Sequence, residues 1–263
     1  MRFRWSLLAV LSVFMFLPLA AQQSPSASSQ AVQYLQRALA ALSGNTPISD
    51  VTLSGTANYI AGSDDETGTA TLKAVVGAGR MDLNLSSGPR SEIENISGAT
   101  PAGSWSGPDG VAHAISYHNL LTCPAWFFPA FPVTHGLSSG YLATYVGHET
   151  RDDQAVEHLT ISQISALQSP AGASIVGHLS QMDFFLDSTT FLPAAVAFNI
   201  HPDNNALLDI PIEVRFSDYR SVSGAQIPFH VRKYLNNGLI LDLQFNNAVL
   251  NSGLPASTFT VSK

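Results

Sequence analysis

Apolar and polar residues alternate with a period of two along most of the chain after residue 50. This period is typical of β-strands with one face in the core and the other in water. We count about eleven such strands, from Val51–Tyr59 through Gly177–Asp187 to Leu239–Val249. Asn236-Asn237-Gly238 is a strong hairpin signal between the last two. Connections this short predict antiparallel neighbours, because parallel strands need long crossovers.

One helix is expected before the strands. Val32, Leu35, Leu39 and Leu42 recur at the spacing of a single helical face, Ser28 or Ser29 can cap its start, and Gly44 ends it. An amphipathic helix needs a surface to cover, and the predicted sheet provides one.

The segment Leu120–Val133, which we call the plug, is the most apolar run after the N-terminal region. It is too short to cross a bilayer, which takes about 20 apolar residues. Its three prolines exclude a strand inside a sheet, because each removes a ladder donor. The pattern therefore predicts a mainly β (α+β) fold. It consists of a curved antiparallel sheet with the N-terminal helix and a bent, partly helical plug on its concave face.

The N-terminus predicts export from the cytoplasm. A basic start, a short apolar core and small residues up to Ala21 are typical of a secretory signal peptide at 1–21. An uncleaved membrane anchor is the alternative, although the apolar core is short for one. Gln22 stands where a lipoprotein signal has its lipidated Cys, so we expect a free periplasmic or secreted protein. A polar tether at 22–28 and one domain at 29–263 would follow.

Charge and cysteine content narrow the function. Cleavage after Ala21 removes Arg2 and Arg4, so the formal net charge falls from −7 to −9. Nucleic acids and anionic membrane surfaces need clustered basic residues, so neither is an expected partner. No permanent membrane span is expected after signal cleavage. Cys123 is the single cysteine, which excludes an intrachain disulfide and a cysteine-rich metal site.

Catalytic and metal-binding motifs are missing from the sequence. Gly103–Gly107 has Trp105 rather than serine at the centre of a Gly-x-Ser-x-Gly-like run, so we interpret it as a turn. His148, Glu149, Asp152, Asp153, Glu157 and His158 form the nearest histidine–carboxylate cluster, which we interpret as a solvated hairpin tip. Asp64-Asp65-Glu66 is interpreted in the same way. We therefore predict no metal, no cofactor and no enzymatic activity, with a hydrolase as the least supported alternative.

The C-terminal third resembles a known family. A strand ending in Phe216-Ser-Asp-Tyr219 precedes a glycine turn and Ile227-Pro228, and a glycine hairpin leads to Leu250-Asn251 and the closing Phe259. This order resembles the LolA/LolB-like superfamily of periplasmic lipoprotein-sorting proteins, over about residues 30–261. The resemblance implies an unclosed β-barrel whose concave apolar face, covered by helices, receives acyl chains. It implies no catalytic residues.

Together these observations predict an envelope protein that binds a lipid or a lipidated protein. The plug supplies the candidate residues for a lid or cavity wall: Leu120, Leu121, Trp126, Phe127, Phe128 and Phe131. The alternative for these side chains is a permanent place in the core, since aromatic clusters are often core. The protein would then be a sensor or interaction module with a filled cavity that binds another envelope protein.

Overall fold

The computed structural model of the chain describes residues 28–44, 46–98, 100–164 and 169–261. The predicted signal peptide lies outside the described residues, and so does the predicted tether apart from Ser28. No helix in the described ranges has the length and hydrophobicity needed to cross a membrane.

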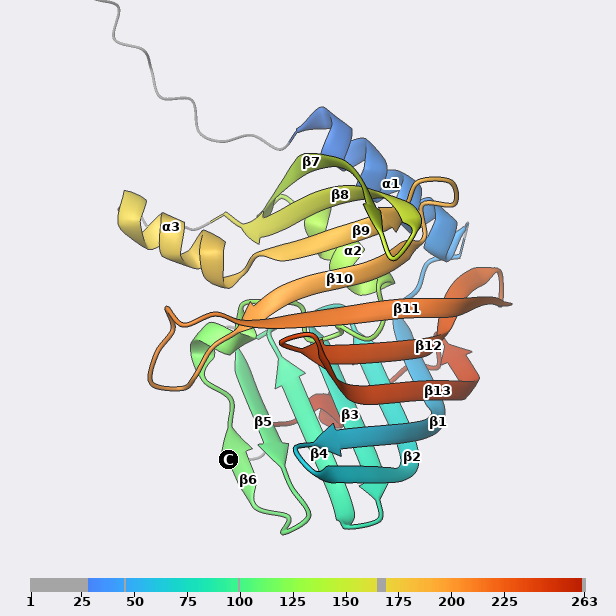
Figure 1. Cartoon of the computed structure of the whole chain (residues 1–263), viewed down its shortest axis with the longest axis vertical. Coiled ribbons are helices and arrows are strands. Elements are labelled where there is room, and N and C mark those ends of the chain that lie inside the picture. Colours follow the sequence, from blue (N-terminus) through green and yellow to red (C-terminus); the bar gives the residue numbers. More distant parts are fainter. Residues whose placement is uncertain (1–27, 45, 99, 165–168, 262–263) are drawn as a thin grey trace, which may run out of the picture.

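Within these described ranges, thirteen strands form one antiparallel sheet in the order β6-β5-β4-β3-β2-β1-β13-β12-β11-β10-β9-β8-β7 (Figure 1). They are β1 (Asp50–Ala61), β2 (Asp64–Val75), β3 (Ala78–Leu85), β4 (Gly88–Asn95), β5 (Ala102–Ser106), β6 (Ala112–Ala114), β7 (Tyr141–Arg151), β8 (Gln154–Gln163), β9 (Met182–Asp187), β10 (Pro193–Ile200), β11 (Ile210–Val222), β12 (Ala225–Leu235) and β13 (Gly238–Leu250). The two edge strands of this described sheet, β6 and β7, do not pair with each other, so the barrel is not closed. The predicted fold class is confirmed.

The sheet has two strands more than the predicted count. The shortest strands are β5 and β6, with five and three residues. Because β5 contains residues 103–106, the interpretation of Gly103–Gly107 as a turn is wrong for all but its last residue. The predicted hairpin between β12 and β13 is present, and Asn236 and Asn237 both adopt the positive φ that its tight turn requires.

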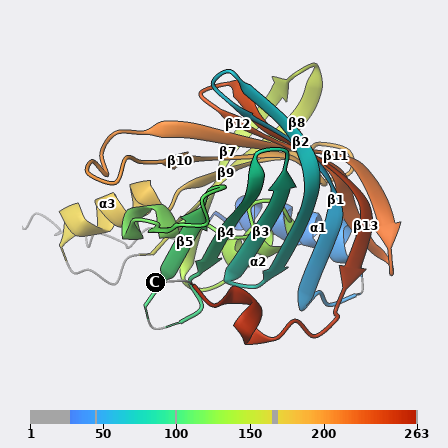
Figure 2. The ribbon, with the colours of Figure 1, turned by 90° about the horizontal axis from the view of Figure 1, so that it is seen from below.

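One face of the sheet carries the core. Cross-strand partners share a face, and the register places Leu53 opposite Leu72, and Val196 between Phe184 and Val214. All five side chains are fully buried. Figure 2 shows α1 and α2 within the hollow of the curved sheet. The concave face is therefore the buried one.

Helix α1 (Ser29–Ser43) begins and ends where the sequence predicts. The Ser28 hydroxyl accepts a hydrogen bond from the Ala31 amide, and Gly44 follows the last turn with positive φ. The most deeply buried positions are Ala31, Leu35, Ala38 and Leu42. The buried face is thus slightly rotated from the predicted one, because small alanines face α2 (Ala130–Gly136) and the sheet.

The plug has the predicted position and character. It runs from the end of the 3-10 helix η1 (Tyr117–Leu120) into α2, and every residue from 120 to 133 is buried. Turn hydrogen bonds such as Phe128 N–H to the Ala125 carbonyl satisfy part of its backbone. The Gln163 amide donates to the Leu121 carbonyl and ties the plug to β8.

Two glycines in the sheet allow the plug to approach closely. A Cβ atom on Gly79 of β3 would lie 2.2 Å from the Pro124 carbonyl oxygen, and one on Gly103 of β5 would lie 2.7 Å from Leu120. Both distances are shorter than van der Waals contact allows. At these positions the backbone of the sheet itself contacts the plug.

Helix α3 (Pro170–Leu179) was not predicted. Its presence shows that the strand predicted at Gly177–Asp187 is wrong over its first residues. Residues 177–179 form the last turn of this helix, and β9 begins only at Met182. Ser169 caps the helix, and Pro170 starts it. The helix contains no Asp, Glu, Lys or Arg, so it has no charged face to indicate a helical period. A final 3-10 helix, η2 (Ala256–Phe259), contacts β3 and β4.

We predict that Gly79→Ala destabilises the protein by about 1–3 kcal/mol, because the new methyl group overpacks the contact with Pro124. Urea unfolding followed by circular dichroism measures this change. Gly177→Ala in α3 is the matched control, because no atom of the described residues lies within 4 Å of the position that its new Cβ atom would take. It should be neutral or slightly stabilising. Equal stability of Gly79→Ala and the wild type would contradict the close contact.

Candidate functional site

A cavity of about 230 Å³ opens on the concave face. Residues of β4 and β5 line one side, and residues of β10 and β12 line the other. Three plug residues, Thr122, Cys123 and Trp126, lie between the two sides. The cavity therefore lies where the plug meets the open part of the sheet.

Aromatic side chains give this cavity an apolar lining. Trp105 of β5 is 46% exposed, and its ring stacks on His113 of β6 at a centroid distance of 4.4 Å. Trp126 is buried in the plug, and Phe198 and Ile200 of β10 also line the cavity. Both tryptophans that follow Trp5 thus line one cavity.

Four charged side chains also line the cavity: Glu92, Glu94, Lys233 and Asp203 of the β10–β11 loop. Glu92 and Glu94 of β4 lie on the concave face of the sheet. They pair with Met81 and Gly79 of β3, and Gly79 contacts the plug on that face. The Lys233 ammonium of β12 lies 4.1 Å from the centre of the Trp126 ring, a cation–π contact. The cavity is therefore amphipathic, with aromatic walls and a compact set of charges.

The environment of Glu94 favours its neutral form. Burial is the main cause that raises the pKa of Glu94 to about 8, and the nearby Glu92 carboxylate adds to the rise. The Lys233 ammonium acts in the opposite direction. At neutral pH the Glu94 carboxyl therefore mostly holds a proton, so it can donate a hydrogen bond as well as accept one.

Of the six predicted site residues, Trp126 lines this cavity. Leu120, Leu121, Phe127, Phe128 and Phe131 are buried among the core residues around the plug and do not line it. Glu94, Lys233 and Trp105 were missed. One signal could have indicated Glu94: Glu92 and Glu94 alternate along β4, and their cross-strand partners in β3 are apolar. Recognising this signal requires the register between β3 and β4, which the sequence does not provide.

Cys123 also lies in the cavity lining, and its thiol is nearly inaccessible. It is 3% exposed, and burial raises the pKa of the thiol to about 12. A thiol with so little thiolate is a poor nucleophile and metal ligand. Cys123 therefore packs as a small buried hydrophobe.

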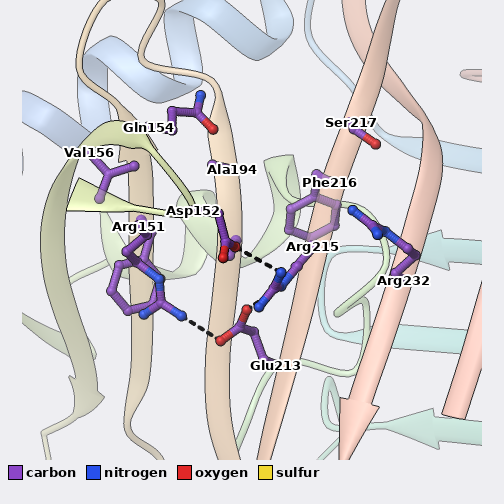
Figure 3. Close-up of a pocket in the computed structure, with 12 residues that line it drawn as sticks. Arg151, Asp152, Gln154, Val156, Ala194, Glu213, Arg215, Phe216, Ser217 and Arg232 are labelled. Carbon is purple, nitrogen blue, oxygen red and sulfur yellow. Dashed lines mark hydrogen bonds and ion pairs between the residues drawn. The ribbon is translucent and has the colours of Figure 1, made fainter. Parts of the chain in front are cut away.

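A second cavity of about 230 Å³ lies on the convex face, beneath the β7–β8 hairpin (Figure 3). Figure 3 shows Arg151 paired with Glu213, and Arg215 paired with Asp152. The Arg151 guanidinium also lies 3.7 Å from the centre of the Phe185 ring. These contacts hold the hairpin tip against the sheet. We therefore assign this cavity a structural role.

The predicted hairpin cluster is more ordered than a solvated tip. Glu157 is buried, and it accepts hydrogen bonds from the Tyr145 hydroxyl at 2.7 Å and from His148 at 3.0 Å. Ser188 contacts the same nitrogen, Nδ1, of His148. A histidine that relays a proton from serine to carboxylate needs one ring nitrogen for each. The Ser188–His148–Glu157 set therefore lacks the geometry of a catalytic triad.

The other predicted tip, at Asp64-Asp65-Glu66, is also partly different. Asp64 and Asp65 are exposed at the start of β2, as expected, but Glu66 is buried. It accepts hydrogen bonds from the Ser87 amide at 2.8 Å and from Arg90 at 2.9 Å. With both carboxylate oxygens engaged by protein donors, Glu66 joins the β1–β2 end to β4.

Solved structures share this fold. A domain from Vibrio parahaemolyticus, described as an outer membrane lipoprotein-sorting protein domain, aligns with a TM-score of 0.54 and 13% identity over 88% of this chain and 96% of its own. A LolA superfamily protein from Nitrosomonas europaea has a TM-score of 0.54 and 12% identity, covering 88% of this chain and 97% of its own. A DUF1329 family protein from Desulfovibrio piger has a TM-score of 0.57 and 11% identity, covering 89% and 98%.

These similarities establish a LolA-like fold and confirm the resemblance detected in the C-terminal third. At identities of 11–13% they establish the fold alone. No protein-family model matches the sequence, and the curated proteins give no match.

We predict that Glu94→Gln flattens the dependence of stability on pH. An acid whose pKa is higher in the folded state than in the unfolded one makes folding less favourable as pH rises between the two values. For Glu94 that window runs from its ordinary value of 4.5 to about 8. The stability of Glu94→Gln relative to wild type should therefore rise on the order of 2 kcal/mol from pH 5 to pH 8.

Urea unfolding at a series of pH values measures this effect. Glu92→Gln removes a charge that raises the pKa of Glu94, so in this variant the loss of stability with rising pH should level off at a lower pH. Parallel pH profiles for Glu94→Gln and the wild type would contradict the assignment.

Proposed function

We propose that the protein is an exported, non-catalytic envelope protein that binds a lipid, or the lipid-modified part of a protein, on its concave face. The observation that carries the proposal is the amphipathic cavity beside the plug. Its aromatic walls suit part of an acyl chain, and Glu94 and Lys233 suit a polar head group. Burial of an acyl chain contributes about 0.8 kcal/mol per CH₂ group.

The size of the cavity limits how much of a lipid enters it. Ligand cavities commonly measure roughly 300–1,000 Å³, and this one measures about 230 Å³. It therefore accepts only part of a long acyl chain while the plug stays in place. Deeper insertion requires the plug to shift, with Phe127, Phe128 and Phe131 as the side chains an acyl chain would displace.

Exposed apolar residues near the cavity support a role at a lipid or lipoprotein surface. Leu207 is 76% exposed and Leu208 is also exposed in the β10–β11 loop, while Ile175 of α3 and Tyr117 of η1 are exposed as well. Figure 1 shows α3, the β10–β11 loop, β5 and β6 along the left side of the molecule. Asp203 of that loop lines the cavity. This side of the molecule, with its exposed apolar residues, thus adjoins the cavity.

A second function, as an envelope sensor or interaction module, is favoured by the filled interior. Every plug residue from 120 to 133 is buried, so the plug packs as part of the core. A permanent plug would leave the exposed apolar residues on this side of the molecule as a surface for another envelope protein.

Tryptophan fluorescence separates these two functions. Trp105 and Trp126 are the tryptophans expected in the mature chain, and both line the cavity. A brominated fatty acid bound there should quench their emission saturably, since bromine quenches at short range. Trp105→Phe isolates Trp126, which should still be quenched. Lys233→Met should weaken binding about tenfold, through loss of the head-group contact, which corresponds to about 1.4 kcal/mol.

Val249→Ala, at an exposed position on β13, is the matched control and should bind as the wild type does. Absence of saturable quenching, or equal quenching in the presence of excess unbrominated fatty acid, would exclude acyl binding at this cavity. The sensor function would then be the better explanation.

A further inference from the structure

We propose that His178, His201 and Asp209 form a binding site for a divalent transition-metal ion such as Zn²⁺, and that the ion fixes α3 to the β10–β11 loop. His178 is in the last turn of α3, His201 directly follows β10, and Asp209 directly precedes β11. The site is independent of the proposed lipid-binding function.

The ligand atoms converge on one point. The Nε2 atoms of His178 and His201 lie 2.9 Å and 3.0 Å from the same Asp209 oxygen, Oδ1. All three atoms lie within 4.8 Å of one another. Zinc bonds of about 2.0–2.1 Å in tetrahedral geometry separate their ligand atoms by roughly 3.3 Å. The two histidine–carboxylate distances are within a few tenths of an ångström of this separation, and the two imidazole nitrogens, no more than 4.8 Å apart, would move together around the ion.

The chemistry of the three donors selects the class of metal. Imidazole nitrogen suits zinc, copper, iron and nickel, while magnesium and calcium prefer oxygen ligands. Two imidazoles and one carboxylate leave a fourth position of a tetrahedral site for water. His178 and Asp209 are exposed, so an ion can reach the site from solvent.

The site is held in place from the sheet side. The His201 side chain is 0% exposed, and its backbone exchanges two hydrogen bonds of 2.8 Å with the Asn119 side chain. His201 is thus fixed with its Nε2 atom directed at Asp209. The ion would also lie near the C-terminus of α3, where the helix dipole favours a cation.

Other histidine–carboxylate contacts differ from this site. Among the described residues, His230 pairs with a single carboxylate, Asp242, at 2.9 Å, and His158 lies between two carboxylates, Asp183 and Glu149. Within the described residues, only the set at the end of α3 brings three such ligand atoms together. An isolated histidine–carboxylate pair, such as His230 with Asp242, therefore provides a matched control.

Isothermal titration of the tag-free, EDTA-treated protein with ZnCl₂ tests the proposal. We expect one Zn²⁺ per chain with micromolar or tighter affinity, and no comparable binding of Mg²⁺ or Ca²⁺. His178→Gln and Asp209→Asn, both at exposed positions, should fold normally and weaken the affinity at least tenfold. His230→Gln should leave it unchanged.

Hydrogen exchange provides a second readout, since zinc should slow amide exchange in α3 of the wild type but not of Asp209→Asn. Failure to bind one equivalent of Zn²⁺ would overturn the proposal. Unchanged affinity in His178→Gln or Asp209→Asn would place the ion elsewhere and would also overturn it. Fatty-acid quenching by the same variants distinguishes loss of this site from loss of the lipid-binding function.

Discussion

The packing of the plug against the bare backbone of the sheet is the contact on which the rest of the structure depends. Gly79 lets the Pro124 carbonyl reach β3, and Gly103 makes room for Leu120 beside β5. An open sheet of thirteen strands has a large apolar face to cover, and α1 alone is too small to do so. The plug and α2 complete that core. The half-barrel therefore keeps a packed interior without closing its edges.

The candidate site lies where the plug stops filling the concave face of the sheet. Beyond Trp126 the plug no longer fills the space between β4–β5 and β10–β12, and a cavity opens there. Charged residues on the apolar side of a sheet are costly unless they have partners or a ligand. Glu94 meets that cost by remaining protonated near neutral pH, and Lys233 lies against an aromatic ring. The same features suit the boundary between an acyl chain and its head group.

Local signals in the sequence predicted much of this fold, because they arise within short segments. Each of these signals is contained in a short stretch of sequence. They are the period of two in the strands, the caps of α1 and the proline-rich apolar run at 120–133. Helix α3 was missed because its residues are mostly small or apolar, with no charged face to mark the period. Glu94 and Lys233 are far apart in the chain and meet only through the strand order and curvature of the sheet. The cluster of His178, His201 and Asp209 depends on the same long-range geometry.

Native mass spectrometry of the protein purified from its own envelope, followed by organic extraction and lipid analysis, tests the central claim most directly. That claim is that the concave face accepts an acyl chain beside the plug. We predict a bound acyl species that is lost on extraction, and that is depleted in a folded Trp126→Gln variant. A ligand-free mass that does not change when fatty acid or phospholipid is added would contradict the claim.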